Sequence, residues 1–495
     1  MRIPALAVAL LLAPVVGTAG PWIDPGDTGL RHDIQLLADA GVITAPVTQW
    51  PLSWGDVLAI SDEPGRVLST AEAAALARVQ RLGKAARTTG EWRPSVAASA
   101  GTEGLTLRNF EATPREKGEL DLGLEWTGKR TALRLQGQYV LDPDGGVDNP
   151  GDSKEWRTDG SYAGIALGNW MVAAAMTDRW WGPGWQSSII LSNNARPIPA
   201  FTLDRNSTAP FESKWLSWIG HWDLAVIWGF LEDSGAVPNA RFFGIRTTVR
   251  PARFLEIGLS RTAMWCGSGR PCGFSTFTDL LLGRDNAGDN VSAADEPGNQ
   301  LGGYDIRLSA ASLGVPVALY TQRIGEDEYN FRPSLYLTQI GAETWGQLGT
   351  LGTVRVYLEA ADTLAGGDFT GDGQPNVAYN HPIYSNGMRY RNRAIGHTAD
   401  NDSRIWTLGV LLNDVADRTW ALTLTAGDLN RVGKPDTANT LTPVKQEYVG
   451  GELLHSRKLP LGTLSASVGL ESLKTPSTGA TDDDWRLFLE WSHQW

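Results

Sequence analysis

Beyond its first residues, the sequence has no apolar run that could cross a membrane as a helix. Such a helix needs about 20 consecutive apolar residues, and no run of that kind follows residue 19. Cysteine is almost absent, because Cys266 and Cys272 are the two cysteines in 495 residues. No histidine or second cysteine pair lies close to them in the sequence, so a zinc site is not indicated. The sequence is therefore not that of a helical membrane protein or of a cysteine-rich metalloprotein.

Motifs for catalysis and for nucleic-acid binding are missing as well. The sequence contains no Gly-x-Ser-x-Gly elbow and no His-Glu-x-x-His motif. Its six histidines stand in no recognisable nucleophile pattern; they are His32, His221, His381, His397, His455 and His493. A net charge of −12 without a long basic block argues against nucleic acid as a partner. We therefore expect a protein that is not an enzyme and that holds no metal and no cofactor.

The N-terminus has the three parts of a secretory signal peptide. Residues 1–2 give a short positive start, residues 3–16 are apolar, and residues 17–19 form a small-residue cleavage sequence. We predict that residues 1–19 are removed and that the mature protein leaves the cytoplasm. In an oxidising compartment, Cys266 and Cys272 stand in a short Gly/Pro-containing loop and are expected to form a disulfide.

Residues 20–90 are predicted to form a small helical bundle. Asp27 can cap a helix that ends near Ala40, Ser53 can cap a short second helix, and Ser69 can open a third helix through a capping box. Because this segment directly follows the signal peptide, we expect the bundle to lie in the periplasm and to plug or brace the rest of the chain.

In residues 91–495 the apolar side chains recur with a period of two, which indicates β-strands. Near the C-terminus, Trp485, Leu487 and Leu489 fall on one face of a strand and Arg486 on the other. A strand of about ten residues with one apolar face is long enough to cross a bilayer when tilted. A soluble sandwich could also end on such a strand. The 21 Trp and 56 Gly favour a membrane barrel, where Trp gathers at the interfaces and Gly in the turns.

Further strand candidates alternate with short turns and long polar loops. At roughly 20–22 residues for a strand and its connections, this region predicts an all-β transmembrane barrel of about 18 antiparallel strands. The candidates lie near residues 120–126, 133–139, 161–167, 171–177, 214–221, 223–232, 242–250, 254–264, 302–310, 315–324, 333–345, 350–361, 404–412, 419–428, 446–455, 462–473 and 484–495.

One string of aromatic residues is a candidate binding element. Asp178 and Arg179 precede Trp180 and Trp181, and Trp185 follows a Gly-Pro-Gly turn. Flat aromatic faces stack on the C–H surfaces of sugars, and the charged neighbours can bond hydroxyl or carboxylate groups. The alternative is that these tryptophans pack an inward-folded loop.

A second candidate string carries three arginines at alternate positions. Arg389, Arg391 and Arg393 would share one face of an extended segment, which suits a chain of uronate carboxylates. The same string also contains His381, Tyr384 and Tyr390. The alternative is a row of arginines that face the barrel lumen and pair with acidic residues across it.

These strings occur within a sequence that resembles the Wzi capsule-assembly family of Gram-negative outer membranes. The resemblance rests on Pro21-Trp22-Ile23-Asp24 with the helix that follows, on residues 180–185 with Ser192-Asn193-Asn194-Ala195-Arg196-Pro197, and on residues 379–397. It implies a barrel of about 18 strands with a periplasmic helical bundle. It also implies a lectin-like role, in which the barrel contacts outer-membrane lipid and holds exported capsular polysaccharide at the cell surface.

We therefore interpret the sequence as that of a non-enzymatic outer-membrane lectin, which we expect to be a monomer. A carbohydrate-selective porin is the first alternative, because it would share an aromatic and arginine lining. An outer-membrane hydrolase is the second, and it would depend on His381 or His397. The sequence does not define which polysaccharide is bound.

Overall fold

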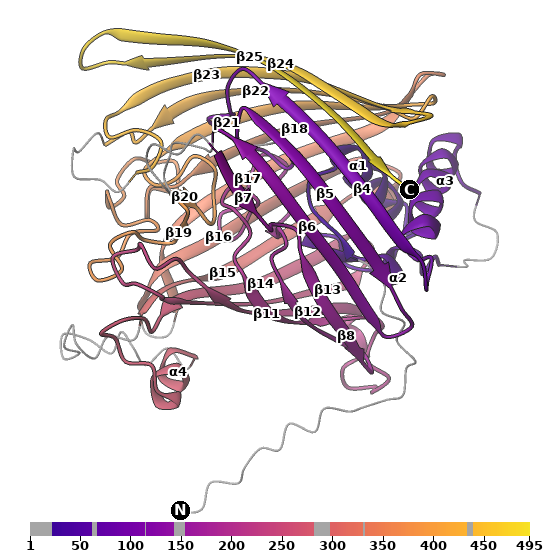
Figure 1. The fold of residues 1–495 in the computed structure, drawn as a ribbon, viewed down its shortest axis with the longest axis horizontal. Helices are drawn as coiled ribbons and strands as arrows, with labels where there is room; N and C mark the ends of the chain where they lie inside the picture. Colours follow the sequence, from indigo (N-terminus) through magenta and orange to yellow (C-terminus); the bar gives the residue numbers. More distant parts are fainter. Residues whose placement is uncertain are drawn as a thin grey trace, which may run out of the picture.

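The computed structural model describes residues 22–61, 67–113, 115–142, 154–281, 298–329, 332–432 and 439–495. The proposed signal peptide at residues 1–19 lies outside the described residues. Most of the described chain forms one closed antiparallel barrel (Figure 1), in which neighbouring strands follow the order of the sequence and β25 pairs with β4 to close the ring.

The barrel has 18 strands in the described part of the chain, because β7 and β8 both pair with β6 and form one interrupted strand. This confirms the predicted fold class. The strands are β4 (Trp92–Gly101), β5 (Gly118–Thr127), β6 (Thr131–Leu141), β7 (Lys154–Arg157), β8 (Tyr162–Leu167), β9 (Trp170–Ala175), β11 (Ala200–Arg205), β12 (His221–Phe230), β13 (Arg241–Ala252), β14 (Leu255–Trp265), β15 (Gly298–Ser309), β16 (Val317–Tyr329), β17 (Arg332–Leu348), β18 (Gly352–Asp362), β21 (Arg404–Asp414), β22 (Arg418–Leu429), β23 (Gln446–Leu459), β24 (Gly462–Thr475) and β25 (Ala480–Gln494).

Four details of the strand prediction need correction. The predicted strand at 214–221 is mostly a connection that contains the short 3-10 helix η2 (Ser217–Ile219). Its Trp215 and Trp218 are 87% and 72% exposed, so their spacing reflects an exposed turn and not a strand face. β4, β7 and β11 were not among the predicted strands. β7 and β11 are too short for a period of two to stand out, and the small side chains of β4, such as Ala97, Ala98 and Ala100, show no clear alternation.

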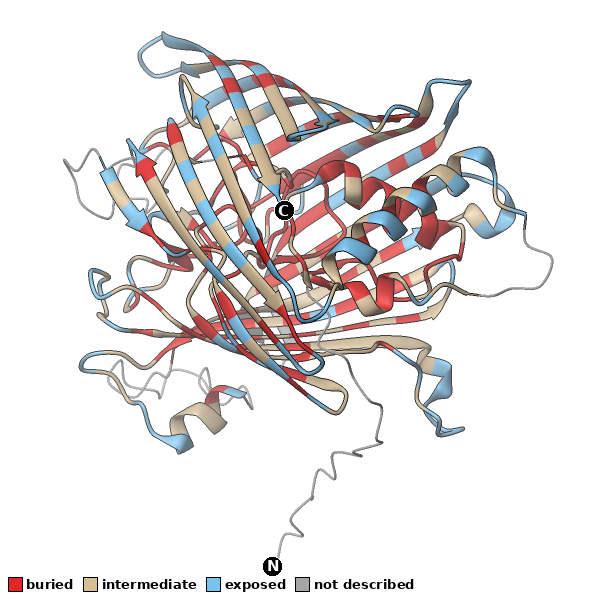
Figure 2. Ribbon diagram, turned by 45° about the vertical axis from the view of Figure 1, so that its right-hand side comes forward, coloured by how far each residue is buried: buried red, intermediate tan, exposed pale blue. Residues whose placement is uncertain are grey.

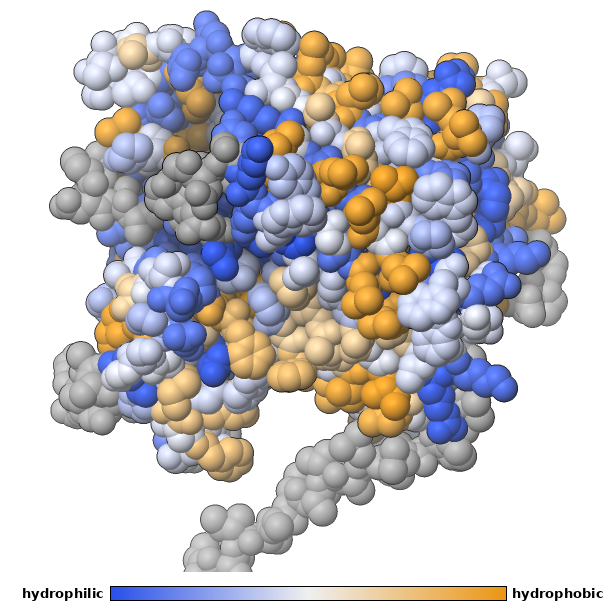
Figure 3. Space-filling model, viewed as in Figure 1, coloured by the Kyte–Doolittle hydropathy of each residue, from blue (hydrophilic) through white to orange (hydrophobic). Residues whose placement is uncertain are grey.

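The outward-facing side chains of the strands are apolar. In β25, Trp485, Leu487 and Leu489 are exposed, whereas Arg486 and Phe488 between them are buried. Figure 2 shows this alternation of buried and exposed residues along the strands, and Figure 3 shows apolar side chains over the outer wall. An apolar exterior around a polar interior is the pattern of a barrel that lies in lipid.

The N-terminal region supplies three helices, α1 (Thr28–Asp39), α2 (Trp54–Val57) and α3 (Thr70–Ala86). Asp27 caps α1, Ser53 caps α2, and Ser69 with Glu72 forms the capping box of α3, as predicted. No helix among the described residues is long and apolar enough to span a membrane. Every residue of α1 except Leu30 is buried, and α1 lies within the barrel (Figure 1). This part of residues 20–90 therefore fills the lumen and is not a separate body.

Two kinds of connection distinguish the two ends of the barrel. Short turns at 128–130, 168–169, 253–254, 349–351, 415–417 and 460–461 lie at one end, which we call the short-turn end. α3 lies at this end, where the Arg93 guanidinium donates to the carbonyl of Ala85. The other end, the long-loop end, carries the connections 102–117, 176–199, 266–297 and 363–403. The predicted disulfide between Cys266 and Cys272 is present in one of these long connections.

The remaining elements are short. In the N-terminal segment, β1 (Trp22–Ile23) pairs with β3 (Leu52–Ser53), and β2 (Gln49–Trp50) pairs with β10 (Trp180–Trp181) of the connection 176–199. β19 (Arg389–Tyr390) and β20 (Arg393–Ala394) form a hairpin in the connection 363–403. The last two are α4 (Phe274–Leu281) and the 3-10 helix η3 (Ala311–Leu313).

Candidate functional site

α1 holds the tryptophan-rich connection inside the barrel through a single arginine. Nη2 of Arg31 donates to the carbonyls of Pro183 and Gly184 at 2.9 and 2.8 Å. The guanidinium carbon lies 4.1 Å from the ring centroid of Trp185 and 4.3 Å from that of Phe110. A cation between two aromatic faces in a buried site is well stabilised. The N-terminal segment and the connection 176–199 therefore meet in the middle of the lumen.

The predicted sugar-stacking tryptophans are interior residues. Trp180, Trp181 and Trp185 are 0%, 0% and 2% exposed. Trp180 pairs with Trp50 in the short β10–β2 ladder, and Nε1 of Trp185 donates to Glu343 at 2.8 Å. Because no ring face is open, the prediction that they stack on a sugar needs correction for this conformation. The alternative interpretation, an inward-folded loop, describes them.

Arg179 is also a structural residue in this conformation. It is 8% exposed, and its Nη1 lies 3.5 Å from the carboxylate of Asp204 on β11. It contributes to the attachment of the connection 176–199 to the wall and not to an open binding surface.

A buried network of charges anchors the lumen filling to the wall. Arg307 pairs with Asp39 at 2.7 Å and with Glu343 at 2.5 Å. Arg355 pairs with Glu343 at 2.6 Å, and its Nε donates to Nδ1 of His32 at 3.1 Å. Burial, followed by the charge of Arg355, holds the pKa of His32 well below its usual range. The neutral imidazole thus accepts from Arg355, and Nε2 lies 3.0 Å from the Thr353 hydroxyl.

The connections 176–199 and 363–403 pack into one body at the long-loop end. The hydroxyl of Tyr379 donates to the carbonyl of Ile189 at 2.7 Å and accepts from the amide of His397 at 3.0 Å. The amide of Ser192 donates to the carbonyl of Ile395 at 2.9 Å. His397 is 0% exposed, and burial lowers its pKa to about 3. His397 therefore cannot reach a substrate at the surface in this conformation.

The three arginines of the second string do not form a ladder. Arg391 and Asn392 have φ values of 50° and 56°, so the chain reverses between β19 and β20 in a two-residue turn. Arg389 points inward and is 4% exposed; its Nε and Nη2 donate to Asp400 at 3.0 and 2.6 Å. The prediction of one extended cationic face needs correction, because Arg389 is a buried partner of Asp400.

The other members of this string differ in exposure. His381, Arg391 and Arg393 are half-buried, whereas Tyr384 and Tyr390 are buried. The guanidinium of Arg391 lies 5.6 Å from the ring centroid of Tyr390. The hydroxyl of Tyr384 donates to the carbonyl of Cys266 at 2.9 Å, which joins this connection to the disulfide loop. The structure thus brings His381, Arg391 and Arg393 onto one rigid connection, apart from the three tryptophans.

Two further arginines, Arg108 and Arg115 of the connection 102–117, were not singled out from the sequence. Arg115 donates to the carbonyls of Asn193 and Ala195 at 2.7 Å each. Arg108 is buried, and burial, followed by the charges of Arg115 and Arg393, holds its pKa well below its usual range. The charges of Arg115 and Arg393 therefore both act on Arg108. No local pattern marks Arg108 or Arg115, because their role depends on contacts between distant segments.

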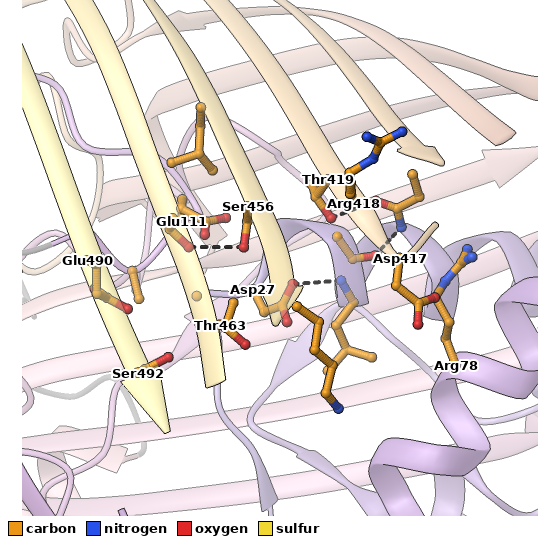
Figure 4. Close-up of a pocket in the computed structure, with 18 of the residues that line it drawn as sticks. Asp27, Arg78, Glu111, Asp417, Arg418, Thr419, Ser456, Thr463, Glu490 and Ser492 are labelled. Atoms are coloured by element: carbon orange, nitrogen blue, oxygen red, sulfur yellow. Dashed lines mark hydrogen bonds between the residues drawn. The ribbon is translucent and has the colours of Figure 1, made fainter. Parts of the chain in front are cut away.

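Cavities remain between the lumen filling and one side of the wall. The larger has a volume of about 680 Å³ and runs along β4, β5 and β6, from Gln494 at the short-turn end to Asp178 and Arg108. A neighbouring cavity of about 310 Å³ is lined by Asp27, Glu111 and Glu490 (Figure 4). Burial, followed by the charge of Asp27, raises the pKa of Glu111 to about 8. This second cavity is lined by carboxylates together with the cations Arg78, Arg81, Arg418 and Lys458.

A closed barrel with an apolar exterior and a filled polar lumen defines an outer-membrane β-barrel protein. The model of the family described as capsule assembly protein Wzi matches residues 87–484, and the chain belongs to this family. A relative from Klebsiella pneumoniae, described as an uncharacterized 55.8 kDa protein in the cps region, is 32% identical over 377 residues. That alignment covers 73% of this chain and 70% of the relative.

A solved structure supports the same assignment. Escherichia coli Wzi, described as an outer membrane protein involved in group 1 capsule assembly and as a carbohydrate-binding β-barrel, is 26% identical to this chain. The TM-score is 0.78, and the match covers 95% of this chain and 98% of the Escherichia coli protein. The protein is therefore located in the outer membrane.

Proposed function

We propose that this protein binds exported capsular polysaccharide at its long-loop end and holds the polymer at the cell surface by binding and not by catalysis. Membership of the Wzi family and the carbohydrate-binding description of the Escherichia coli structure support this proposal. In outer-membrane barrels the short turns face the periplasm and the long loops face outward. On that orientation α3 lies in the periplasm and the connection 363–403 meets the capsule.

The observation that carries the proposal is the position of Arg391 and Arg393. Both side chains are half-buried on a hairpin that the packing of residues 363–403 holds in place. The charge of Arg393 acts on the buried guanidinium of Arg108. A guanidinium fork pairs well with the carboxylates of an acidic sugar chain. We therefore assign the first contacts with the polymer to Arg391, Arg393 and the neighbouring His381.

Tyr384, Tyr390 and Arg389 have a supporting role in this proposal. Tyr384 bonds to the disulfide loop, Tyr390 packs under the Arg391 guanidinium, and Arg389 bonds to Asp400. They fix the shape of the hairpin that carries Arg391 and Arg393. A single hairpin gives weak binding, but a long polymer engages many barrels in one membrane, so the overall attachment gains from avidity.

The test is direct binding of the purified, detergent-solubilised full chain to the surface polysaccharide of its own strain. The double variant Arg391→Gln with Arg393→Gln should lower the affinity at least several-fold. The matched control is Lys129→Gln with Arg130→Gln, which removes two exposed cations from the short turn at 128–130. The control should bind as the unchanged protein does. Equal binding by both variants would remove the two arginines from the site, and no binding by the unchanged protein would overturn the proposed function.

A carbohydrate-selective porin has one observation in its favour, the polar cavity of about 680 Å³ beside the lumen filling. The filling itself favours attachment over transport, because the N-terminal segment and the connection 176–199 cross the lumen and bond to each other. Conductance through single barrels separates the two functions.

A further inference from the structure

The short helix α4 (Phe274–Leu281) lies outside the barrel and not over its mouth. It belongs to the connection between β14 and β15 and follows the loop closed by Cys266 and Cys272. Figure 1 shows it beyond the strands at the end of the barrel that carries β19 and β20. The helix is therefore next to the wall near the outer face of the membrane.

The wall residues that α4 covers lie on the outer face of the barrel, as the alternation of side chains along β14 shows. Glu256 of β14 points into the lumen, because its carboxylate accepts from the amides of residues 47 and 48. Side chains alternate along a strand, so Ala263 and Trp265 of β14 point outward, as does Phe243, which pairs with Ala263. These three are 5% exposed or less, whereas Leu259, on the same outer face, is 58% exposed. The difference arises because α4 covers this part of the wall.

Aromatic packing and one guanidinium fix the helix in this position. The ring centroid of Phe277 lies 5.0 Å from that of Trp228, 5.1 Å from that of Trp265 and 5.3 Å from that of Phe243. Arg261, which also faces outward, donates to the carbonyls of Leu280 and Leu281 at 2.7 and 3.0 Å. An arginine at the last carbonyls of a helix satisfies acceptors that the helix itself leaves open. α4 is thus a built element of the outer wall.

The helix keeps an apolar side that the wall does not cover. Phe274 is 82% exposed and Leu281 is 38% exposed, and their spacing places them close together on the helix, beside the stripe of Phe277 and Leu280 that packs on the wall. Ser275 and Asp279 occupy the opposite side. A second copy of the chain is not expected to cover Phe274 and Leu281, because one side of an eight-residue helix is far smaller than a stable dimer interface.

We propose that α4 is an interfacial helix that inserts Phe274 and Leu281 into the outer leaflet of the outer membrane. The strip continues the apolar exterior of the barrel, which already contacts lipid, and a helix with one apolar side lies stably at a lipid surface. The hydroxyl of Tyr384 bonds to the carbonyl of Cys266 beside this helix. The depth of α4 in the leaflet therefore helps to set the height at which the connection 363–403 stands above the membrane.

Nitroxide labels on introduced cysteines test this placement in the full chain in phospholipid nanodiscs. The native cysteines are joined to each other, so Phe274→Cys provides a free thiol, and intact mass under non-reducing conditions verifies the disulfide. Ser275→Cys is the matched control on the polar side, and Leu259→Cys is the reference for lipid contact. The label at 274 should resemble the label at 259, with high collision with oxygen and low collision with a water-soluble nickel chelate. The label at 275 should show the reverse.

Two results would overturn the inference. If the label at 274 meets the nickel chelate as often as the label at 275, the strip faces water. If it meets neither reagent, protein covers it. The unlabelled chain gives an independent measurement by hydrogen exchange. The amides of residues 274–281 should exchange several-fold more slowly in nanodiscs than in amphipol, where no bilayer is present.

Discussion

The guanidinium of Arg31 lies over the ring of Trp185, 4.1 Å from its centroid, while the same group bonds to the carbonyl of Gly184. Arg31 belongs to the N-terminal helix and Trp185 to a connection that enters from the opposite end of the barrel. One side chain therefore joins the two halves of the lumen filling.

Replacement of Arg31 should loosen the connection 176–199. Arg31→Met keeps the length of the side chain but leaves the carbonyls of Pro183 and Gly184 without their charged donor. We expect a loss of about 2 kcal/mol in the free energy of local opening, because buried hydrogen bonds to a charged group contribute about 1.5–3 kcal/mol. Hydrogen exchange of residues 183–188 measures the change.

The control for this experiment is Arg81→Met. Arg81 pairs with Asp417 at 2.6 Å, but its side chain is 49% exposed. Exposed ion pairs contribute about 0–1 kcal/mol, so this variant should leave the exchange of residues 183–188 unchanged. Equal protection in Arg31→Met and in the unchanged protein would show that Arg31 does not hold the connection.

Arg389→Gln should damage the fold of the connection 363–403, in contrast to the variants at Arg391 and Arg393. The substitution leaves Asp400 buried without its main cation, and breaking a buried ion pair costs about 3–5 kcal/mol. Limited proteolysis between residues 363 and 403 should become faster. Adding Asp400→Asn should restore part of the resistance, because the pair acts as a unit. A single Arg389→Gln variant with unchanged proteolysis and lowered binding would instead place Arg389 in the polymer site.

The N-terminal segment should become less stable as the pH rises through 8. The pKa of Glu111 is raised to about 8 in the folded chain, from an ordinary value of 4.5. Between these values the folded state binds the additional proton, so its stability is highest below pH 4.5 and falls as Glu111 ionises. The Glu111 carboxyl accepts from the amide of Thr28, so hydrogen exchange of residues 28–33 reports the loss.

Glu111→Gln is the variant that tests this dependence, since an amide oxygen can still accept from Thr28 but does not ionise. In this variant the hydrogen exchange of residues 28–33 should depend less on pH between 6 and 9. Some pH dependence should remain from Asp27, because burial also raises the pKa of Asp27. An identical pH profile in the variant would show that Glu111 is not the group responsible.

Single barrels in a planar bilayer should conduct little. The N-terminal segment and the connection 176–199 fill the lumen and are bonded to the wall by Arg307, Arg355 and Glu343. We expect no large, steady current steps from the unchanged protein. A variant that lacks residues 22–61 is the positive control, because it removes α1 from the lumen and should conduct more than the unchanged protein wherever it inserts. Large ohmic steps from the unchanged protein would favour the porin.

The sequence is informative where the signal is local. Alternation predicts strands such as β25, because each residue of a tilted strand faces either lipid or the lumen. Asp27 and Ser69 predict helix starts because capping involves residues a few positions apart. The disulfide follows from two cysteines in one loop. Short strands such as β7 and β11 carry too few residues to show a period.

The candidate site was harder to predict, because burial of the tryptophans and of Arg389 depends on distant partners. Trp180 packs against Phe110, and Arg389 pairs with Asp400, and no spacing rule connects either residue to its partner. The turn at Arg391 and Asn392 has positive φ values without the Asn-Gly signal that usually marks such a turn. The chain therefore reverses where alternation predicts an extended segment. Arg391 and Arg393 are half-buried at this hairpin, whereas Arg389 is buried.

The ladder between β2 and β10 bears on biogenesis. Gln49 and Trp50 reach Trp180 and Trp181 inside a ring that the pairing of the first and last barrel strands closes. Because the two strands of this ladder come from different segments, residues 22–61 and the connection 176–199 have to reach their final positions together.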